Sequence, residues 1–290
     1  MGKVVFGSSG NDEDFYLEHT SSSEAPAYLA EKGVYAYEYG FTHGIHSNQL
    51  NAYLDLANEC ASHNVTLSIH AQFFINFASD EVIKIDNSIN YLLQSYSYGT
   101  LKMGAEHIVF HPASLGKHSR EEALNITRAN LTEFAERFKT YKEANGDHKV
   151  YFCIETMGKH GQLGTVDEVL ELCKISDIFM PCIDFGHINS FEGGSLKSVE
   201  DYMKIINKIK AAFGDERANN LHIHFSKIKY GPKGELSHLK FEDEGEPDYK
   251  QMIDALIESD VNATVICESR GSQMKDAKIM QDYYDSRVNL

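Results

Sequence analysis

The sequence lacks any apolar run long enough to cross a membrane, and it lacks a secretion signal. No stretch of the 290 residues approaches the roughly 18 consecutive apolar residues of a membrane-spanning helix. The first ten residues, MGKVVFGSSG, do not show the charged and then apolar layout of a signal peptide. We therefore expect a cytoplasmic protein with no membrane partner.

Positive charge is also scarce. The chain has 27 lysines and arginines against 43 aspartates and glutamates, which gives a formal net charge of −16. Much of such a surface repels a phosphate backbone, so nonspecific binding of nucleic acid is disfavoured. This expectation reverses locally if the carboxylates and some of the 14 histidines bind divalent metal ions.

Disulfides, linkers and low-complexity segments are not indicated either. The five cysteines are odd in number and widely spaced, and three of them lie in apolar runs, which is typical of reduced core thiols. Hydrophobic residues make up 42% and charged residues 24%, as in ordinary globular chains. The absence of a linker rich in Gly, Pro or Ser favours one domain over residues 1–290.

Eight short apolar or β-branched runs alternate with amphipathic segments along the whole chain, a pattern typical of repeated βα units. Capping boxes at Ser119 with Glu122 and at Thr165 with Glu168 predict two helix starts. Residues 7–10 (GSSG) do not fit G-x-G-x-x-G, which disfavours a doubly wound sheet. We therefore predict a single (β/α)8 TIM barrel, with strands at residues 4–7, 35–39, 65–70, 107–111, 150–155, 178–184, 221–225 and 263–268.

Six consecutive predicted strands end in a residue type that binds metal ions. In a TIM barrel the carboxyl ends of the strands meet at one face, where function resides. Six such endings in succession favour a metal site, and mixed imidazole and carboxylate ligands suit zinc better than manganese or iron. The residues are His70, His111, Glu155, Asp184, His224 and Glu268.

Two further histidines extend this candidate site. His187 follows Asp184 by three residues, and Gly186 between them permits a tight turn that aims both side chains inward. His238 lies in the predicted loop after the seventh strand, where a solvated histidine is equally compatible with the sequence.

Four segments in this order resemble the endonuclease IV family, and the resemblance extends from about residue 65 to residue 270. Residues 68–79 (SIHAQFFINFAS) are similar to the family's SxHAPYxINLAS, and residues 110–114 (FHPAS) contain a counterpart of its HPGS. Residues 182–187 (CIDFGH) are similar to CxDTCH, and residues 223–229 (IHFSKIK) to the HLNDSK region.

This resemblance implies a TIM barrel with three zinc ions that cleaves the DNA phosphodiester 5′ to an abasic site in base excision repair. His70 and His111 would hold one zinc, and Glu155 would bridge it to a second, completed by Asp184, His224 and Glu268. His187 and His238 would hold the third. Closely spaced zinc ions activate water and neutralise phosphate charge, so no side-chain nucleophile is needed. Glu155 as the bridge and Glu268 as an orienting base are the expected catalytic residues.

The sequence departs from the family pattern at three places. The third zinc of the family also takes an aspartate two residues before the loop histidine, where this chain has Leu236, and Glu235 is the nearest substitute. Residues 155–162 (ETMGKHGQ) replace ENTAGQG. After the second strand, residues 38–44 (EYGFTHG) replace a polar, arginine-containing loop that enters DNA in the family.

DNA with abasic sites is the implied partner, and we expect a monomer. Phe73 falls where the family has a stacking tyrosine, although a core or pocket-wall phenylalanine fits the sequence equally well. Basic residues near the predicted mouth, among them Lys229 and Arg270, are compatible with phosphate contacts or with a solvated face.

The main alternative is a divalent-metal sugar isomerase or epimerase of the same barrel superfamily. Glu38, Glu155, Asp184 and Glu268 could form such a site. An isomerase needs one or two ions and more carboxylates, whereas eight candidate ligands rich in histidine favour a zinc cluster. A metal-stabilised binding protein is disfavoured, since structural zinc prefers closed, thiolate-rich sites.

Overall fold

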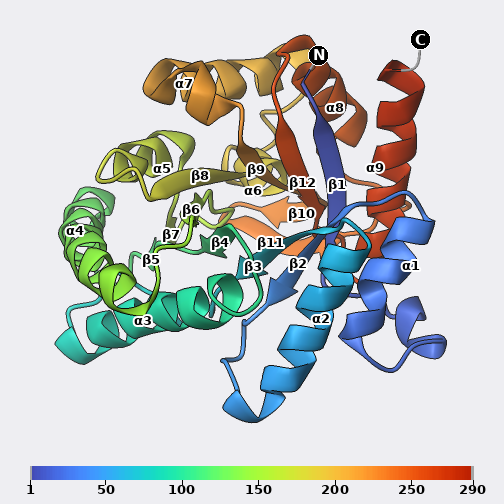
Figure 1. Cartoon of the computed structure of the whole chain (residues 1–290). Helices are drawn as coiled ribbons and strands as arrows, with labels where there is room; N and C mark the ends of the chain where they lie inside the picture. The colour runs from blue at the N-terminus through green and yellow to red at the C-terminus, as the bar shows by residue number, and fades with distance from the viewer. Residues whose placement is uncertain (1, 289–290) are drawn as a thin grey trace.

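The computed structural model, which describes residues 2–288, is a closed barrel of eight parallel strands surrounded by helices (Figure 1). The predicted TIM barrel is confirmed, and each predicted strand lies within two residues of an observed one. In order around the barrel the strands are β1 (Val4–Ser9), β12 (Ala263–Cys267), β9 (Leu221–Phe225), β8 (Phe179–Asp184), β6 (Tyr151–Glu155), β4 (His107–Phe110), β3 (Thr66–His70) and β2 (Ala36–Gly40).

Helices follow the strands along the chain, and the two predicted capping boxes are formed. Ser119 Oγ accepts from the backbone N–H of Glu122, and the Glu122 carboxylate accepts from that of Ser119. Thr165 and Glu168 make the same reciprocal pair. The helices are α1 (Ala25–Glu31), α2 (Leu50–Ser62), α3 (Val82–Ser95), α4 (Arg120–Asn145), α5 (Val166–Cys173), α6 (Phe185–Phe191), α7 (Val199–Ala218), α8 (Tyr249–Glu258) and α9 (Gln273–Val288).

The main hydrophobic core lies between the strands and the helices. Phe134 and Phe138 of α4 pack edge-on against Phe152 of β6, with ring centroids 4.8 and 4.9 Å apart. A small separate apolar cluster comprises Val109, Cys153, Met180 and Cys182, from β4, β6 and β8. Barrel interiors are usually filled with bulky aliphatic side chains, whereas here Glu38, Ser68 and His222 are polar and buried.

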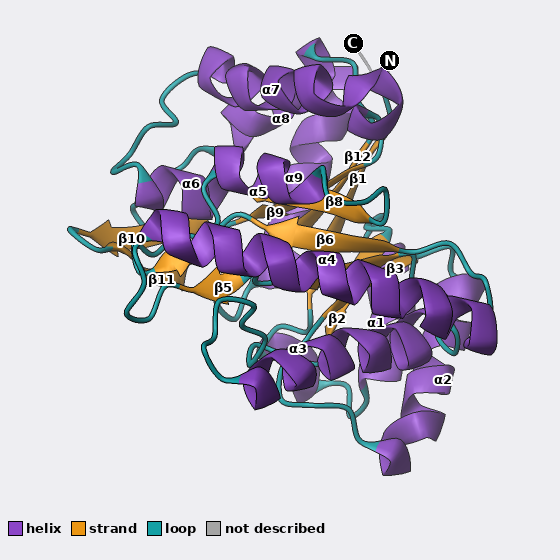
Figure 2. Ribbon diagram, turned by 90° about the vertical axis from the view of Figure 1, so that its left-hand side faces the viewer, coloured by secondary structure: helices purple, strands orange, loops and turns teal. Residues whose placement is uncertain are grey.

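Additional strands cover the carboxyl-terminal end of the barrel. The hairpin of β10 (Lys227–Gly231) and β11 (Gly234–Leu239) follows β9, and it lies at the same end of the barrel as β5 (Ala113–Ser114) (Figure 2). β5 pairs with β7 (Gln162–Leu163). No helix within residues 2–288 combines the length and apolar character of a membrane span.

Two local expectations are corrected. His187 does not follow a tight turn, because Asp184 is the N-cap of α6 and its side chain accepts from the His187 N–H at 2.7 Å. Gly186 is still required, since a Cβ there would lie 2.6 Å from the Ser226 carbonyl oxygen. His238 lies on β11 and not in a loop.

Candidate metal centre

Three groups of potential ligands meet at the carboxyl-terminal end of the barrel. Within each group the ligand atoms lie within 4.8 Å of one another. The first group is His70, His111 and Glu155. The second is Glu155, Asp184, His224 and Glu268, and it shares Glu155 with the first. The third is His187, Glu235 and His238. All eight ligands proposed from the sequence, together with Glu235, therefore come together.

The first group is centred on one carboxylate oxygen. Glu155 Oε2 lies 3.2 Å from His70 Nε2 and 3.0 Å from His111 Nε2. Burial alone would lower the pKa of His70, but the hydrogen bond and charge of Glu155 outweigh it and raise that pKa to about 9. Zinc would take the place of the proton between these atoms.

The second group uses the other oxygen of Glu155. His224 Nδ1 lies 3.2 Å from Glu155 Oε1 and 3.4 Å from Glu268 Oε1. Burial alone would raise the pKa of Glu155, but the charges of His111 and His224 hold it well below its ordinary value. Asp184 Oδ2 is buried and has no hydrogen-bond partner among the described residues, which is unfavourable unless a cation binds there.

The third group is formed between α6 and the hairpin. Glu235 Oε2 lies 3.5 Å from His187 Nε2, and Glu235 Oε1 lies 3.8 Å from His238 Nε2. Leu236, which replaces the family aspartate, is exposed, whereas its neighbour Glu235 belongs to the group. The residues present thus supply a carboxylate from the adjacent position of β11.

The imidazoles are oriented as metal ligands usually are. Nδ1 of His70 donates to the Ala71 carbonyl, Nδ1 of His187 to that of Thr156, and Nδ1 of His238 to that of Glu268, all at 2.9 Å. A carbonyl oxygen only accepts, so Nδ1 carries a proton, and Nε2 faces the group, where its lone pair would bind an ion that replaces its proton. This donor set of neutral imidazoles and carboxylates fits zinc.

A cavity of about 240 Å³ opens onto the three groups and includes Phe73 and Lys159 in its wall. Phe73 is 47% exposed and packs against Phe74, with ring centroids 4.1 Å apart, so it is not a core residue. Lys159 is the one lysine or arginine among the described residues that line this cavity, and its Nζ lies 3.8 Å from Glu235 Oε1. Lys159 could not be singled out from the sequence.

The other basic residues expected near the substrate lie elsewhere. Lys229 is exposed on β10 and lines a different depression together with Lys197 and Glu246. Arg270 is exposed in the turn that follows β12 and does not line the cavity.

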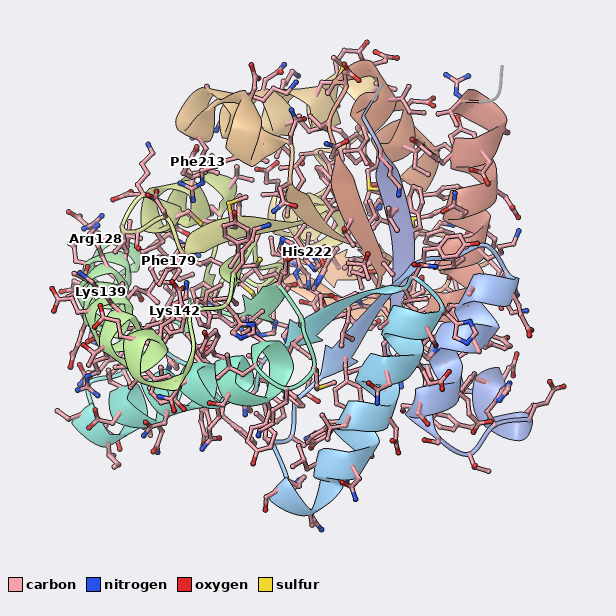
Figure 3. The ribbon with its side chains drawn as sticks, viewed as in Figure 1. Arg128, Lys139, Lys142, Phe179, Phe213 and His222 are labelled. Atoms are coloured by element: carbon pink, nitrogen blue, oxygen red, sulfur yellow. The ribbon has the colours of Figure 1, made fainter. Side chains whose placement is uncertain are left out.

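Below the second group lies a buried polar cluster that the sequence did not indicate as part of the zinc site. Glu38 of β2 is fully buried, and it lies within 3.0 Å of both His222 and His224 of β9. β2 and β9 are not neighbours in the barrel, so these contacts cross its interior; Figure 3 shows His222 within the ring of strands. The signal available in the sequence was a glutamate within a strand and a second histidine two residues before His224.

The fold and this centre define a class of protein: a TIM barrel with a candidate metal site, rich in histidines and carboxylates, at the carboxyl-terminal end of its strands. The family described as xylose isomerase-like TIM barrel matches residues 26–285, so the chain belongs to this family. An uncharacterized protein of Methanocaldococcus jannaschii is 32% identical over 220 residues, which cover 76% of this chain and 77% of that protein.

The expected resemblance to endonuclease IV is also confirmed. A probable endonuclease 4 of Mycoplasma genitalium is 27% identical over 176 residues, which cover 58% of this chain and 54% of that protein. Endonuclease IV of Thermus thermophilus superimposes with a TM-score of 0.64 at 15% identity, covering 98% of this chain and 99% of that one. D-psicose 3-epimerase of Clostridium cellulolyticum gives 0.62 at 15% identity, covering 100% and 97%. At these identities the structural matches show the fold.

Proposed function

We propose that the protein is a zinc-dependent endonuclease of the endonuclease IV type, which hydrolyses the DNA phosphodiester 5′ to abasic sites. The observation that carries the proposal is the joining of three ligand groups through shared or adjacent side chains at one cavity. A site for a single ion would need only one of them. Similarity to a probable endonuclease 4 supports the same activity.

Each group has a distinct part in this proposal. His70, His111 and Glu155 would hold one zinc, Glu155, Asp184, His224 and Glu268 a second, and His187, Glu235 and His238 a third. Bound zinc would activate water and neutralise charge on the attacked phosphate and the leaving oxygen. Glu268 is the least buried carboxylate of the second group and borders the cavity, so it can also orient the attacking water.

Two residues on the cavity wall would handle the DNA itself. The exposed ring of Phe73 can stack on bases beside the abasic site. The ammonium group of Lys159 can contact a phosphate, and it compensates in part for the arginine-containing loop that the chain lacks. Phosphate binding then depends on the metal ions and Lys159, because the acidic surface elsewhere repels phosphate.

The second group alone supports a second candidate, a sugar epimerase. Its three carboxylates and one imidazole would hold a single divalent ion, and the barrel also superimposes on that of D-psicose 3-epimerase. From the sequence, Glu38 is a candidate ligand for such a site, but it is in none of the groups that contain Glu155. This alternative assigns no role to the histidines of the first and third groups.

The experiment compares the two activities on one zinc-loaded preparation. The substrates are duplexes with an abasic site, intact duplexes, nicked duplexes, and a panel of ketoses and aldoses. We expect incision 5′ to the abasic site and no change in any sugar. Sugar turnover without incision of any duplex would overturn the proposal in favour of the epimerase.

A further inference from the structure

We propose that Glu38 is a positioning residue that holds the His224 ring so that Nδ1 faces the second group. This inference rests on the proposed zinc centre, because it assigns a role to a side chain one step away from the ligands. Glu38 lies on β2, a strand that contributes no ligand to any of the three groups.

His224 is an exception among the histidines of the centre. His70, His187 and His238 each present Nε2 to their group and hold Nδ1 on a backbone carbonyl. His224 presents Nδ1, so its Nε2 points away from the group and into the barrel. A ring in this orientation needs an acceptor for the Nε2 proton where no carbonyl is available.

Glu38 is placed to be that acceptor. Its Oε1 lies 3.0 Å from His224 Nε2, within the distance of an ion pair, and neither atom is hydrogen-bonded to any of the described residues. Both side chains are fully buried, so water does not substitute for either of them. The pair therefore depends on itself, and loss of the carboxylate would leave a buried N–H without an acceptor.

The other oxygen of Glu38 is fixed from two sides. Oε2 accepts from Ser68 Oγ at 2.9 Å and lies 2.8 Å from His222 Nε2. His222 is itself stacked on His107, with ring centroids 5.3 Å apart and an interplanar angle of 17°. The carboxylate thus cannot rotate without breaking contacts with β3 and β9, which makes it a rigid support for His224.

The test replaces the carboxylate by an amide of nearly the same shape. Loss of an outer acceptor typically lowers metal affinity about 10- to 100-fold, so Glu38→Gln should bind zinc at the second group that much more weakly in competition with a chelator. The first and third groups should change by less than about threefold. Asp276→Asn is the control, because Asp276 is another buried carboxylate, held by Ser272 and the Phe241 N–H and part of none of the three groups.

A second measurement needs no variant, so it holds even if Glu38→Gln does not fold. Nitrogen NMR of histidine-labelled, zinc-loaded protein should show His224 protonated at Nε2 and bound through Nδ1. Binding through Nε2 would overturn the inference, as would unchanged zinc affinity in Glu38→Gln. The inference would also be overturned if the wild type bound one zinc ion beyond the three and Glu38→Gln lost that ion. Cys182, His222 and His224 would then hold an ion of their own.

If the wild-type protein binds no zinc at all, the proposed function fails. If it binds zinc as proposed and Glu38→Gln binds it equally well, the positioning role alone is wrong.

Discussion

Glu155 has the largest expected effect of any single residue, because its two oxygens face different groups. Oε2 contacts the imidazoles of the first group and Oε1 contacts His224. Glu155→Ala should lower incision by more than about 100-fold, beyond the effect of losing an outer contact, and should weaken zinc binding at both groups. Metal analysis with a turnover assay measures this.

The barrel of Glu155→Ala should remain folded, since the core lies between strands and helices and not at the mouth. Circular dichroism checks the fold. Glu106→Ala is the matched control, because Glu106 is exposed and its carboxylate pairs with Lys149 at 2.8 Å. Wild-type activity in a folded Glu155→Ala would reject Glu155 as a bridging ligand.

Phe73 should affect the choice of substrate more than the chemistry. Stacking of one base on an aromatic ring contributes about 1–3 kcal/mol, so Phe73→Ala should reduce the preference for abasic over intact duplex by about 5- to 150-fold. Phe73→Tyr should retain it. The measurement is binding to both duplexes together with single-turnover incision; an equal loss for both duplexes, or a loss in the chemical step alone, would contradict this role.

Residues at strand ends were predictable, and residues that act across the barrel were not. His70 and Glu155 end apolar runs, so their convergence follows from the topology of parallel strands. Glu38 lies within its strand, and its contact with His222 depends on how the barrel closes. The sequence indicated Glu235 only as the nearest substitute for the family aspartate, and its position opposite His187 depends on the hairpin.

At the scale of elements, the loop after β6 holds the hairpin against α6. The Glu235 N–H donates to the Gly158 carbonyl at 2.9 Å, and the His160 N–H donates to that of Lys233 at 3.1 Å. This segment replaces the family's ENTAGQG, and the polar sequence of the hairpin did not resemble buried barrel strands. The strands β10 and β11 were for that reason missed, and His238 was assigned to a loop.

Gly158 is the critical position of this loop. A Cβ there would lie 2.9 Å from both Glu235 Cβ and His187 Cδ2 and 2.8 Å from Ser190 Oγ. Gly158→Ala should therefore displace the third group and weaken its zinc by about tenfold or more, as loss of a supporting contact does, and leave the first two groups unchanged.

Gly161→Ala is the control, since a Cβ at Gly161 meets nothing within 4 Å. Competition with a chelator measures the affinity of the most weakly bound zinc ion in each variant. Equal affinity of all equivalents in Gly158→Ala and the wild type would contradict the assigned packing.

Arg120 and Glu168 fix the other end of the same loop. Arg120 donates to both oxygens of Glu168 and to the carbonyls of His160 and Gln162. Burial alone would raise the pKa of Glu168, but Arg120 and the Gly164 and Thr165 N–H groups lower it below its ordinary value of 4.5. A depressed folded pKa stabilises the protein above the unfolded pKa, and this stability is lost as the pH falls through the folded pKa.

Glu168→Gln should thus lower the free energy of unfolding by about 1.5–3 kcal/mol at pH 7, the range for hydrogen bonds to charged groups. The difference from the wild type should stay constant down to about pH 5 and shrink below pH 4.5. Urea unfolding over this pH range measures it. A difference that does not depend on pH would show that the charge of Glu168 contributes nothing.

At the scale of the whole molecule, the fold was the most predictable part. Strands buried on both faces appear as continuous apolar runs, so all eight could be located from the sequence. The net charge of −16 is harder to interpret. It opposes DNA binding over the surface, whereas bound zinc would make the cavity attractive to phosphate. Function therefore depends on how many ions the mouth holds.

The most direct test of this account is a zinc anomalous-scattering map from crystals of the protein, with the stoichiometry checked by elemental analysis in solution. We predict three peaks, one within each ligand group, with the first two flanking Glu155 and the third between His187, Glu235 and His238. A single peak held by Glu155, Asp184, His224 and Glu268, with the other histidines free, would contradict the zinc-cluster endonuclease.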